Sequence, residues 1–92
     1  MVDFSLIYDT YHRIHQHLVE TPLLESYFLS NRLNKRVLIK AECLQKTGSF
    51  KYRGSWSSFV NNDIEDLKKG VLAYSSGNHA QCIAAVANQL KI

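Results

Sequence analysis

The apolar residues in the first part of the chain share one helical face. They follow one another at spacings of four, three and four, as Ile7, Tyr11, Ile14 and Leu18. This pattern predicts an amphipathic helix over residues 3–18. The helix ends before Pro22, because proline disfavours a helical conformation in the residue ahead of it. A weaker signal predicts a short helix over residues 26–33.

Two short apolar runs, residues 37–41 and 71–74, predict buried strands. Between them, residues 50–60 predict a helix whose inner side holds Tyr52, Trp56, Phe59 and Val60. Two strands joined by a crossover helix form a parallel pair, so the pattern predicts an α/β domain. After the second strand, a last helix places one apolar face inward, with Ile83, Val86, Ala87 and Leu90.

The predicted sheet is incomplete. Parallel sheets are normally covered on both faces, and two strands make a poor sheet. At 92 residues the chain can hold one small domain, and it stops at Ile92 with no Gly or Asn to close the last helix. We therefore expect residues 1–92 to be a truncated α/β domain without a second domain.

Composition indicates an ordinary globular protein, with 46% hydrophobic and 21% charged residues. The eleven Lys and Arg residues are scattered, so we expect no nucleic-acid partner. No apolar run reaches the ~20 residues that span a bilayer, so we expect no membrane partner. Cys43 and Cys82 lack Cys-x-x-Cys spacing, which predicts two buried free thiols and a cytoplasmic location.

Three histidines near the start of the chain, His12, His15 and His17, are close in sequence. On a helix that turns about 100° per residue, His17 points away from the other two. We therefore predict a solvated helix face and no metal site.

Ser75-Ser76-Gly77-Asn78-His79 lies where the second predicted strand leads into a helix. At such a junction, free backbone N–H groups and the helix dipole favour an anion such as a carboxylate or phosphate. A plain Ser or Asn helix cap would use the same residues, and from spacing alone the cap is the preferred interpretation.

Lys51 lies in the first turn of its predicted helix, just after Gly48. It would point to the same sheet edge as the serine-rich loop, so both could contact one ligand. A neutral lysine amine attacks carbonyls to form an imine, which requires a lowered pKa, and Arg53 could supply the positive charge that lowers it. Because six other lysines share the chain, a solvated surface residue is the alternative.

The motifs Ser-Phe-Lys-x-Arg-Gly, at residues 49–54, and Ser-Gly-Asn-His, at residues 76–79, occur together in this order. With Thr21-Pro22-Leu23 ahead of them, they resemble the fold-type II pyridoxal-phosphate enzymes, in particular threonine dehydratase and serine racemase. The resemblance covers essentially the whole chain and implies a tryptophan-synthase-β-like domain that binds pyridoxal 5′-phosphate.

The resemblance also implies a role for each motif residue. Lys51 would carry the cofactor as an imine and act as an acid/base, Phe50 would pack on its ring, and Asn78 would hydrogen-bond its phenolic oxygen. Ser76 would be a second acid/base on the opposite face. The substrate carboxylate would be received by Ser75, Ser76, Gly77, Asn78 and His79.

By resemblance, the expected reaction is β-elimination of ammonia from L-threonine or L-serine, giving a 2-oxo acid. Ala80 favours a dehydratase, whereas the Ser76 hydroxyl favours the alternative, serine racemisation. In the family, the glycine-rich phosphate loop and the residue facing the pyridine nitrogen come later than Ile92. We therefore expect the 92-residue chain alone to be inactive and to self-associate, and its full-length relatives to be homo-oligomers. A non-catalytic remnant is the other alternative.

Overall fold

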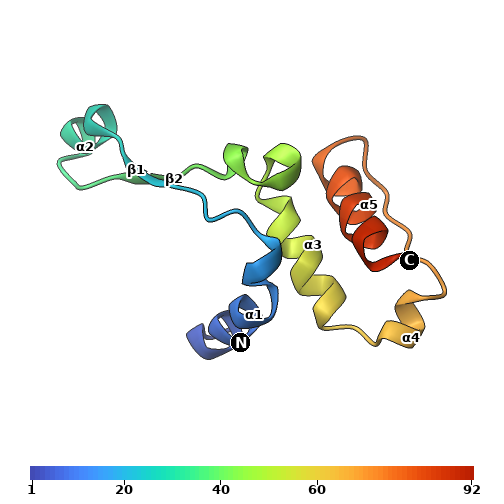
Figure 1. Ribbon diagram of the computed structural model, residues 1–92. Coiled ribbons are helices and arrows are strands. Elements are labelled where there is room, and N and C mark those ends of the chain that lie inside the picture. Colours follow the sequence, from blue (N-terminus) through green and yellow to red (C-terminus); the bar gives the residue numbers. More distant parts are fainter.

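Five α-helices and a two-stranded sheet make up the computed structural model, which describes residues 1–92 (Figure 1). The helices are α1 (Phe4–Ile14), α2 (Tyr27–Leu33), α3 (Lys51–Val60), α4 (Ile64–Leu67) and α5 (Asn78–Leu90). The strands are β1 (Leu23–Glu25) and β2 (Leu38–Lys40), and the 3₁₀ turns are η1 (His15–His17), η2 (Glu42–Leu44) and η3 (Lys46–Gly48). The chain is thus α/β with a small sheet, and the predicted helices are confirmed.

The helix ends follow from local chemistry. Asp3 caps α1 by accepting a hydrogen bond from the Leu6 amide at 3.1 Å, and Ser26 caps α2 in the same way. The helical stretch that begins with α1 continues as η1 to His17, close to the predicted end. At the end of α5, Lys91 takes the left-handed conformation that glycine usually provides, with φ 57°.

The predicted parallel pairing of the strands is wrong in this structure. β2 pairs antiparallel with β1, so that Leu24 lies opposite Ile39. Residues 71–74 form no strand, because no other strand lies beside them, and Leu72 and Tyr74 are fully exposed. β2 is not the buried strand we expected either, since all three of its residues are exposed.

The hydrophobic core lies between α3 and α5, which pack side by side (Figure 1). It consists of Ile14, Tyr52, Trp56, Phe59, Cys82, Val86 and Ala87. The predicted inner side of α3 is confirmed for Tyr52, Trp56 and Phe59, whereas Val60 is only partly buried. The predicted burial of Cys82 is confirmed. The predicted burial of Cys43 is wrong, because this residue lies in the short turn η2, away from the core, and is exposed.

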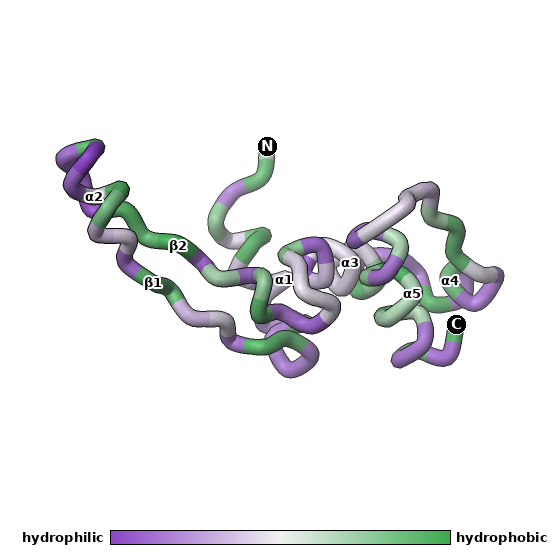
Figure 2. The backbone as a smooth tube through the Cα atoms, turned by 90° about the horizontal axis from the view of Figure 1, so that it is seen from above, coloured by the Kyte–Doolittle hydropathy of each residue, from purple (hydrophilic) through white to green (hydrophobic).

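β1, α2 and β2 form an arm that projects from the helices (Figure 1). Apolar residues run along both of its strands (Figure 2). The molecule is consequently elongated, at 51 × 31 × 24 Å. No helix combines the length and the apolar content that crossing a membrane requires.

Candidate functional site

A tight turn sets the start of α3 and the position of Lys51. Thr47 and Gly48 both adopt positive φ angles, 62° and 76°, and the Gly48 amide donates to the Gln45 carbonyl at 2.8 Å. The left-handed conformation favours glycine, which explains Gly48. The turn brings Ser49 to a buried position, after which α3 begins at Lys51.

The Lys51 side chain is exposed, and its amine makes no ion pair. Its Nζ lies 5.3 Å from the centre of the Phe50 ring, which is itself 61% exposed. A cation over an aromatic face is a weak attraction at an exposed site, so the amine is held only loosely. The Lys51 amine is therefore accessible to a carbonyl compound.

Lys51 and His79 line the same cleft, which has a volume of about 450 Å³. α3 forms one side of it, and residues 71–73 and α5 form the other. The remaining lining residues are Gly54, Ser55, Ser58, Phe59, Leu67, Val71, Leu72, Ala73 and Ile83. The structure thus brings together one residue from each predicted motif.

The other residues of the serine-rich loop do not line this cleft. Ser75, Ser76 and Asn78 are exposed beside it, and Gly77 is half-buried. Ser75 Oγ accepts a hydrogen bond from the Gly77 amide at 3.2 Å, within the loop itself. α5 then begins without a side-chain cap, so the plain Ser or Asn helix cap that spacing alone favoured is wrong. The first amides of α5 have no acceptor inside the helix, and they suit an anion.

Arg53 does not serve Lys51 as we expected, because it pairs with Glu42. Its Nε donates to Glu42 Oε2 and its Nη2 donates to Glu42 Oε1, each at 2.8 Å. These hydrogen bonds lower the pKa of Glu42 to about 2, and they raise the pKa of Arg53. The charge of Arg53 is therefore balanced by Glu42.

Several polar side chains from residues 40–46 hold the segment that precedes β1. The Gln45 amide group is bonded to both the N–H and the carbonyl of Val19, at 2.9 Å each. Thr21 Oγ1 donates to Glu42, and Lys46 Nζ donates to the His17 carbonyl at 2.8 Å. This supporting network was not predicted, although a buried amide such as Gln45 must find hydrogen-bond partners.

The cleft also contains two serines that sequence reasoning missed. Ser55 and Ser58 follow Lys51 by four and seven residues on α3, and both line the cleft. Residues at this spacing share one helical face, so the signal was present in the sequence. Ser55 is buried, and its hydroxyl donates to the Lys51 carbonyl at 3.0 Å.

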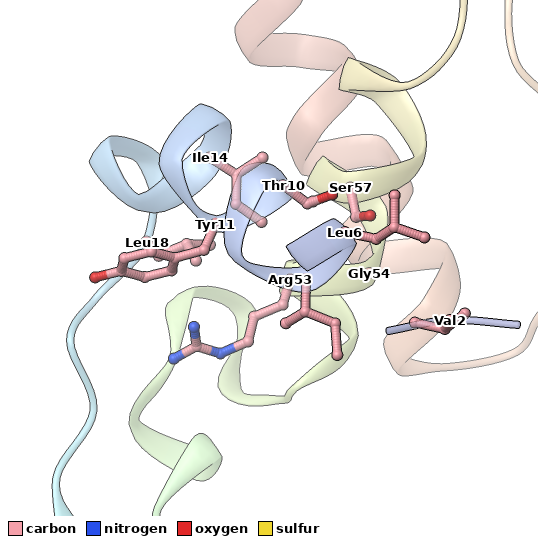
Figure 3. A pocket seen from close by; sticks show the side chains of 10 residues that line it. Val2, Leu6, Thr10, Tyr11, Ile14, Leu18, Arg53, Gly54 and Ser57 are labelled. Atoms are coloured by element: carbon pink, nitrogen blue, oxygen red, sulfur yellow. The ribbon is translucent and has the colours of Figure 1, made fainter. Parts of the chain in front are cut away.

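A second groove, of about 430 Å³, lies between α1 and α3 (Figure 3). Apolar side chains of α1 such as Leu6 and Ile14 form one wall, and Arg53, Gly54 and Ser57 form the other. None of the residues predicted to contact the cofactor or the substrate lines this groove. Gly54 borders both hollows, but Lys51, Ser55 and Ser58 line only the first and Arg53 and Ser57 only the second, so the two lie on neighbouring faces of α3.

His17 stacks on the Trp56 ring, with the ring centres 3.8 Å apart and the planes 4° apart. Burial lowers the pKa of His17, and the nearby Lys46 adds to this. His12 and His15 remain exposed on α1 and η1. His17 is therefore a packing residue rather than part of the solvated face that we expected.

Lys51 in the cleft and the N-terminus of α5, which reaches the cleft through His79, together fit pyridoxal phosphate. Lys51 offers an amine without an ion-pair partner, to which the carbonyl carbon of the cofactor can be joined. The open N-terminus of α5 and its neighbouring hydroxyls offer donors to a carboxylate or phosphate.

Comparison with known proteins tests the family. A model of the family described as pyridoxal-phosphate dependent enzyme matches residues 14–92. L-threo-3-hydroxyaspartate ammonia-lyase of Saccharomyces cerevisiae is 40% identical over 86 residues, which are 94% of this chain and 26% of that protein. The solved threonine deaminase from T.th. has a TM-score of 0.80 and 45% identity, over 99% of this chain and 32% of that one.

Maize serine racemase has a TM-score of 0.85 and 36% identity, over 99% of this chain and 29% of that one. The chain therefore spans about a quarter to a third of the length of these relatives. The predicted resemblance and the predicted cofactor are confirmed. This chain belongs to the family of pyridoxal-phosphate dependent enzymes.

Proposed function

We propose that this chain supplies the cofactor-bearing lysine of a lyase that deaminates L-threonine or L-serine to a 2-oxo acid and ammonia. The observation that carries the proposal is the cleft shared by Lys51 and His79. The ammonia-lyase and threonine deaminase among its relatives support this reaction class. The two free cysteines favour a reducing compartment such as the cytoplasm.

Each residue has a proposed part in this reaction. Lys51 Nζ would hold the cofactor through its carbonyl carbon, with loss of water, and, once the substrate amine has displaced it, the free Lys51 amine would move the proton at the α-carbon of the substrate. Phe50 would pack against the cofactor ring, and Asn78 would donate to its phenolic oxygen. The chemistry that pyridoxal phosphate supplies when bound is an electron sink for the α-carbanion.

The substrate carboxylate binds at the start of α5. Ser75, Ser76, Gly77, Asn78 and His79 offer hydroxyl, amide, imidazole and backbone N–H donors there. Because the positive end of a helix dipole favours an anion, this position suits a carboxylate. It would also orient the α-carbon toward Lys51, whose cleft includes His79.

Serine racemisation is the second candidate. It needs an acid/base on each face of the cofactor, and the exposed hydroxyl of Ser76 is a candidate for the second one. The likeness to maize serine racemase supports it as well. Product analysis separates the two, because racemisation of L-serine gives D-serine, whereas deamination gives a 2-oxo acid.

The contribution of the 92-residue chain by itself is a separate proposal. Its cleft is lined on one side by residues 71–73, where Leu72 is fully exposed to solvent. An open cleft excludes water poorly and holds a cofactor loosely. We propose that this chain alone binds pyridoxal phosphate weakly and releases no ammonia, whether as part of an enzyme or as a non-catalytic protein.

Reductive trapping tests the assignment of Lys51. The chain is incubated with pyridoxal phosphate, reduced with borohydride and digested, and the labelled lysines are quantified by mass spectrometry. We expect Lys51 to carry more label than each of the other six lysines, and Lys51→Ala to remove only that label. Lys68→Ala, which loses an exposed lysine paired with Glu65, is the matched control.

Two outcomes would contradict the proposal. Equal labelling of all seven lysines would remove Lys51 from the site. Ammonia release by the purified chain that Lys51→Ala abolishes would disprove the expected inactivity of the chain. It would still support Lys51 as the site residue. The same assay with L-serine, L-threonine and their D-forms then distinguishes deamination from racemisation.

A further inference from the structure

Cys82 connects the turn before Lys51 to α5. Its side chain is completely buried, and it lies one helical turn after Asn78, where α5 begins. Its Sγ is 2.9 Å from Thr47 Oγ1 and 3.7 Å from Ser49 Oγ. These are contacts between the two segments that carry the two motifs.

The turn that Cys82 contacts has an unfavourable backbone conformation. Thr47 has φ 62° and ψ 5°, a left-handed conformation that β-branched residues rarely adopt. Such a residue persists only when its surroundings fix it. The hydrogen bond between Thr47 Oγ1 and the Cys82 thiol is a contact that can do so, four residues ahead of Lys51.

We propose that Cys82 is a positioning residue, whose thiol holds the Thr47 turn against α5 and so fixes Lys51 relative to His79. Its relevance to catalysis rests on the proposed function. A thiol can both donate and accept a hydrogen bond, so the buried Cys82 side chain can link the hydroxyl groups of Thr47 and Ser49. A serine at this position preserves the hydrogen bond, whereas an alanine removes it.

Amide hydrogen exchange of the whole chain tests the link without any cofactor. The Gly48 amide, bonded to the Gln45 carbonyl, reports on the turn. After correction for the change in global stability, Cys82→Ala should accelerate the exchange of the Gly48 amide about fivefold. A factor of this size corresponds to the loss of one hydrogen bond. Cys82→Ser should stay within about twofold of the wild type.

Two further variants control the experiment. Thr47→Val keeps the β-branched shape and removes the hydroxyl that contacts the Cys82 thiol. Because Thr47 is exposed, this variant should show the same faster exchange of Gly48 even if Cys82→Ala folds poorly. Val86→Ala removes buried volume from the same helix without touching the turn. It should lower global stability and leave the corrected exchange of Gly48 unchanged.

The labelling of Lys51 is the second readout. Cys82→Ala and Thr47→Val should lower the share of reductive label on Lys51 about fivefold relative to the other lysines, and Cys82→Ser should restore it. Unchanged Gly48 exchange in Cys82→Ala and Thr47→Val, or an equal effect of Val86→Ala, would overturn the proposal. Absence of preferential Lys51 labelling in the wild type would refute the proposed function instead, while the exchange data still decide the role of Cys82.

Discussion

Glu42 joins three parts of the chain through one carboxylate. It accepts two hydrogen bonds from Arg53 on α3 and one from Thr21 in the segment before β1. Its side chain is only 14% exposed, so the paired geometry is partly shielded from water. Because the Thr47 turn lies between Glu42 and Arg53 in the sequence, this ion pair also fixes the ends of the turn that leads to Lys51.

The lowered pKa of Glu42 predicts a dependence of stability on pH. The folded value of about 2 lies below the usual 4.5, so the ionised carboxylate stabilises the folded chain fully above pH 4.5. This contribution, on the order of 1–3 kcal/mol, is lost as the pH falls toward 2. Urea unfolding of the wild type and Glu42→Gln at several pH values measures it.

We expect Glu42→Gln to be less stable than the wild type at pH 7, and we expect the difference to shrink in acid. Glu65→Gln, which removes an exposed carboxylate paired with Lys68, is the control and should change stability by less than about 0.5 kcal/mol. A difference between wild type and Glu42→Gln that is the same at pH 3 and pH 7 would contradict this account.

Single residues were predictable where a motif identified them. Lys51 and His79 were chosen from sequence, and the structure places them in one cleft. The pairing of Glu42 with Arg53 was missed, because their contact over eleven residues depends on the geometry of the intervening turn. For the same reason, Arg53 was wrongly predicted to supply positive charge to Lys51. The number of residues between two positions does not show which partner each side of a helix faces.

Helices were predictable because their signal is local, whereas strand pairing was not. The spacing of Tyr52, Trp56 and Phe59 defines a helical face by itself. A strand needs a neighbour, and the apolar run at residues 71–74 carries no information about one. β1 was missed as well, although the end of the first helical stretch before Pro22 was predicted correctly.

α1 is attached to α3 by one buried side chain and by the hydrogen bonds of Arg13 to Val60 and Asn61. Ile14 is its only buried residue, and it packs against the core formed by α3 and α5. Ile14→Ala should destabilise this contact by about 2–4 kcal/mol and release α1, while the core between α3 and α5 remains folded. Amide hydrogen exchange resolved by residue measures this.

Leu6→Ala is the matched control, since Leu6 lines the same groove but is 54% exposed. It should change the exchange of α1 only slightly. Faster exchange spread evenly over α1, α3 and α5 in Ile14→Ala would show that α1 is instead part of one cooperative unit.

The molecule as a whole exposes much apolar surface. Its radius of gyration is 15.9 Å, whereas a compact domain of this length has about 12 Å. The arm carries about a third of the exposed large apolar residues, among them Leu23, Leu24, Tyr27, Phe28, Leu38 and Ile39. Its two short strands also have an unpaired edge each, which can accept another strand.

These features predict that the purified chain self-associates and binds an apolar dye. Leu24→Lys combined with Ile39→Glu should reverse both, because the two residues lie opposite each other and gain an opposite-charge pair while the arm loses apolar surface. Asn88→Lys combined with Asn62→Glu adds the same charges outside the arm and should leave association unchanged. Sedimentation at several concentrations measures the change, which we expect to be at least about tenfold in the association constant. A wild-type chain that remains monomeric and does not bind the dye would show that this apolar surface is compatible with a stable monomer.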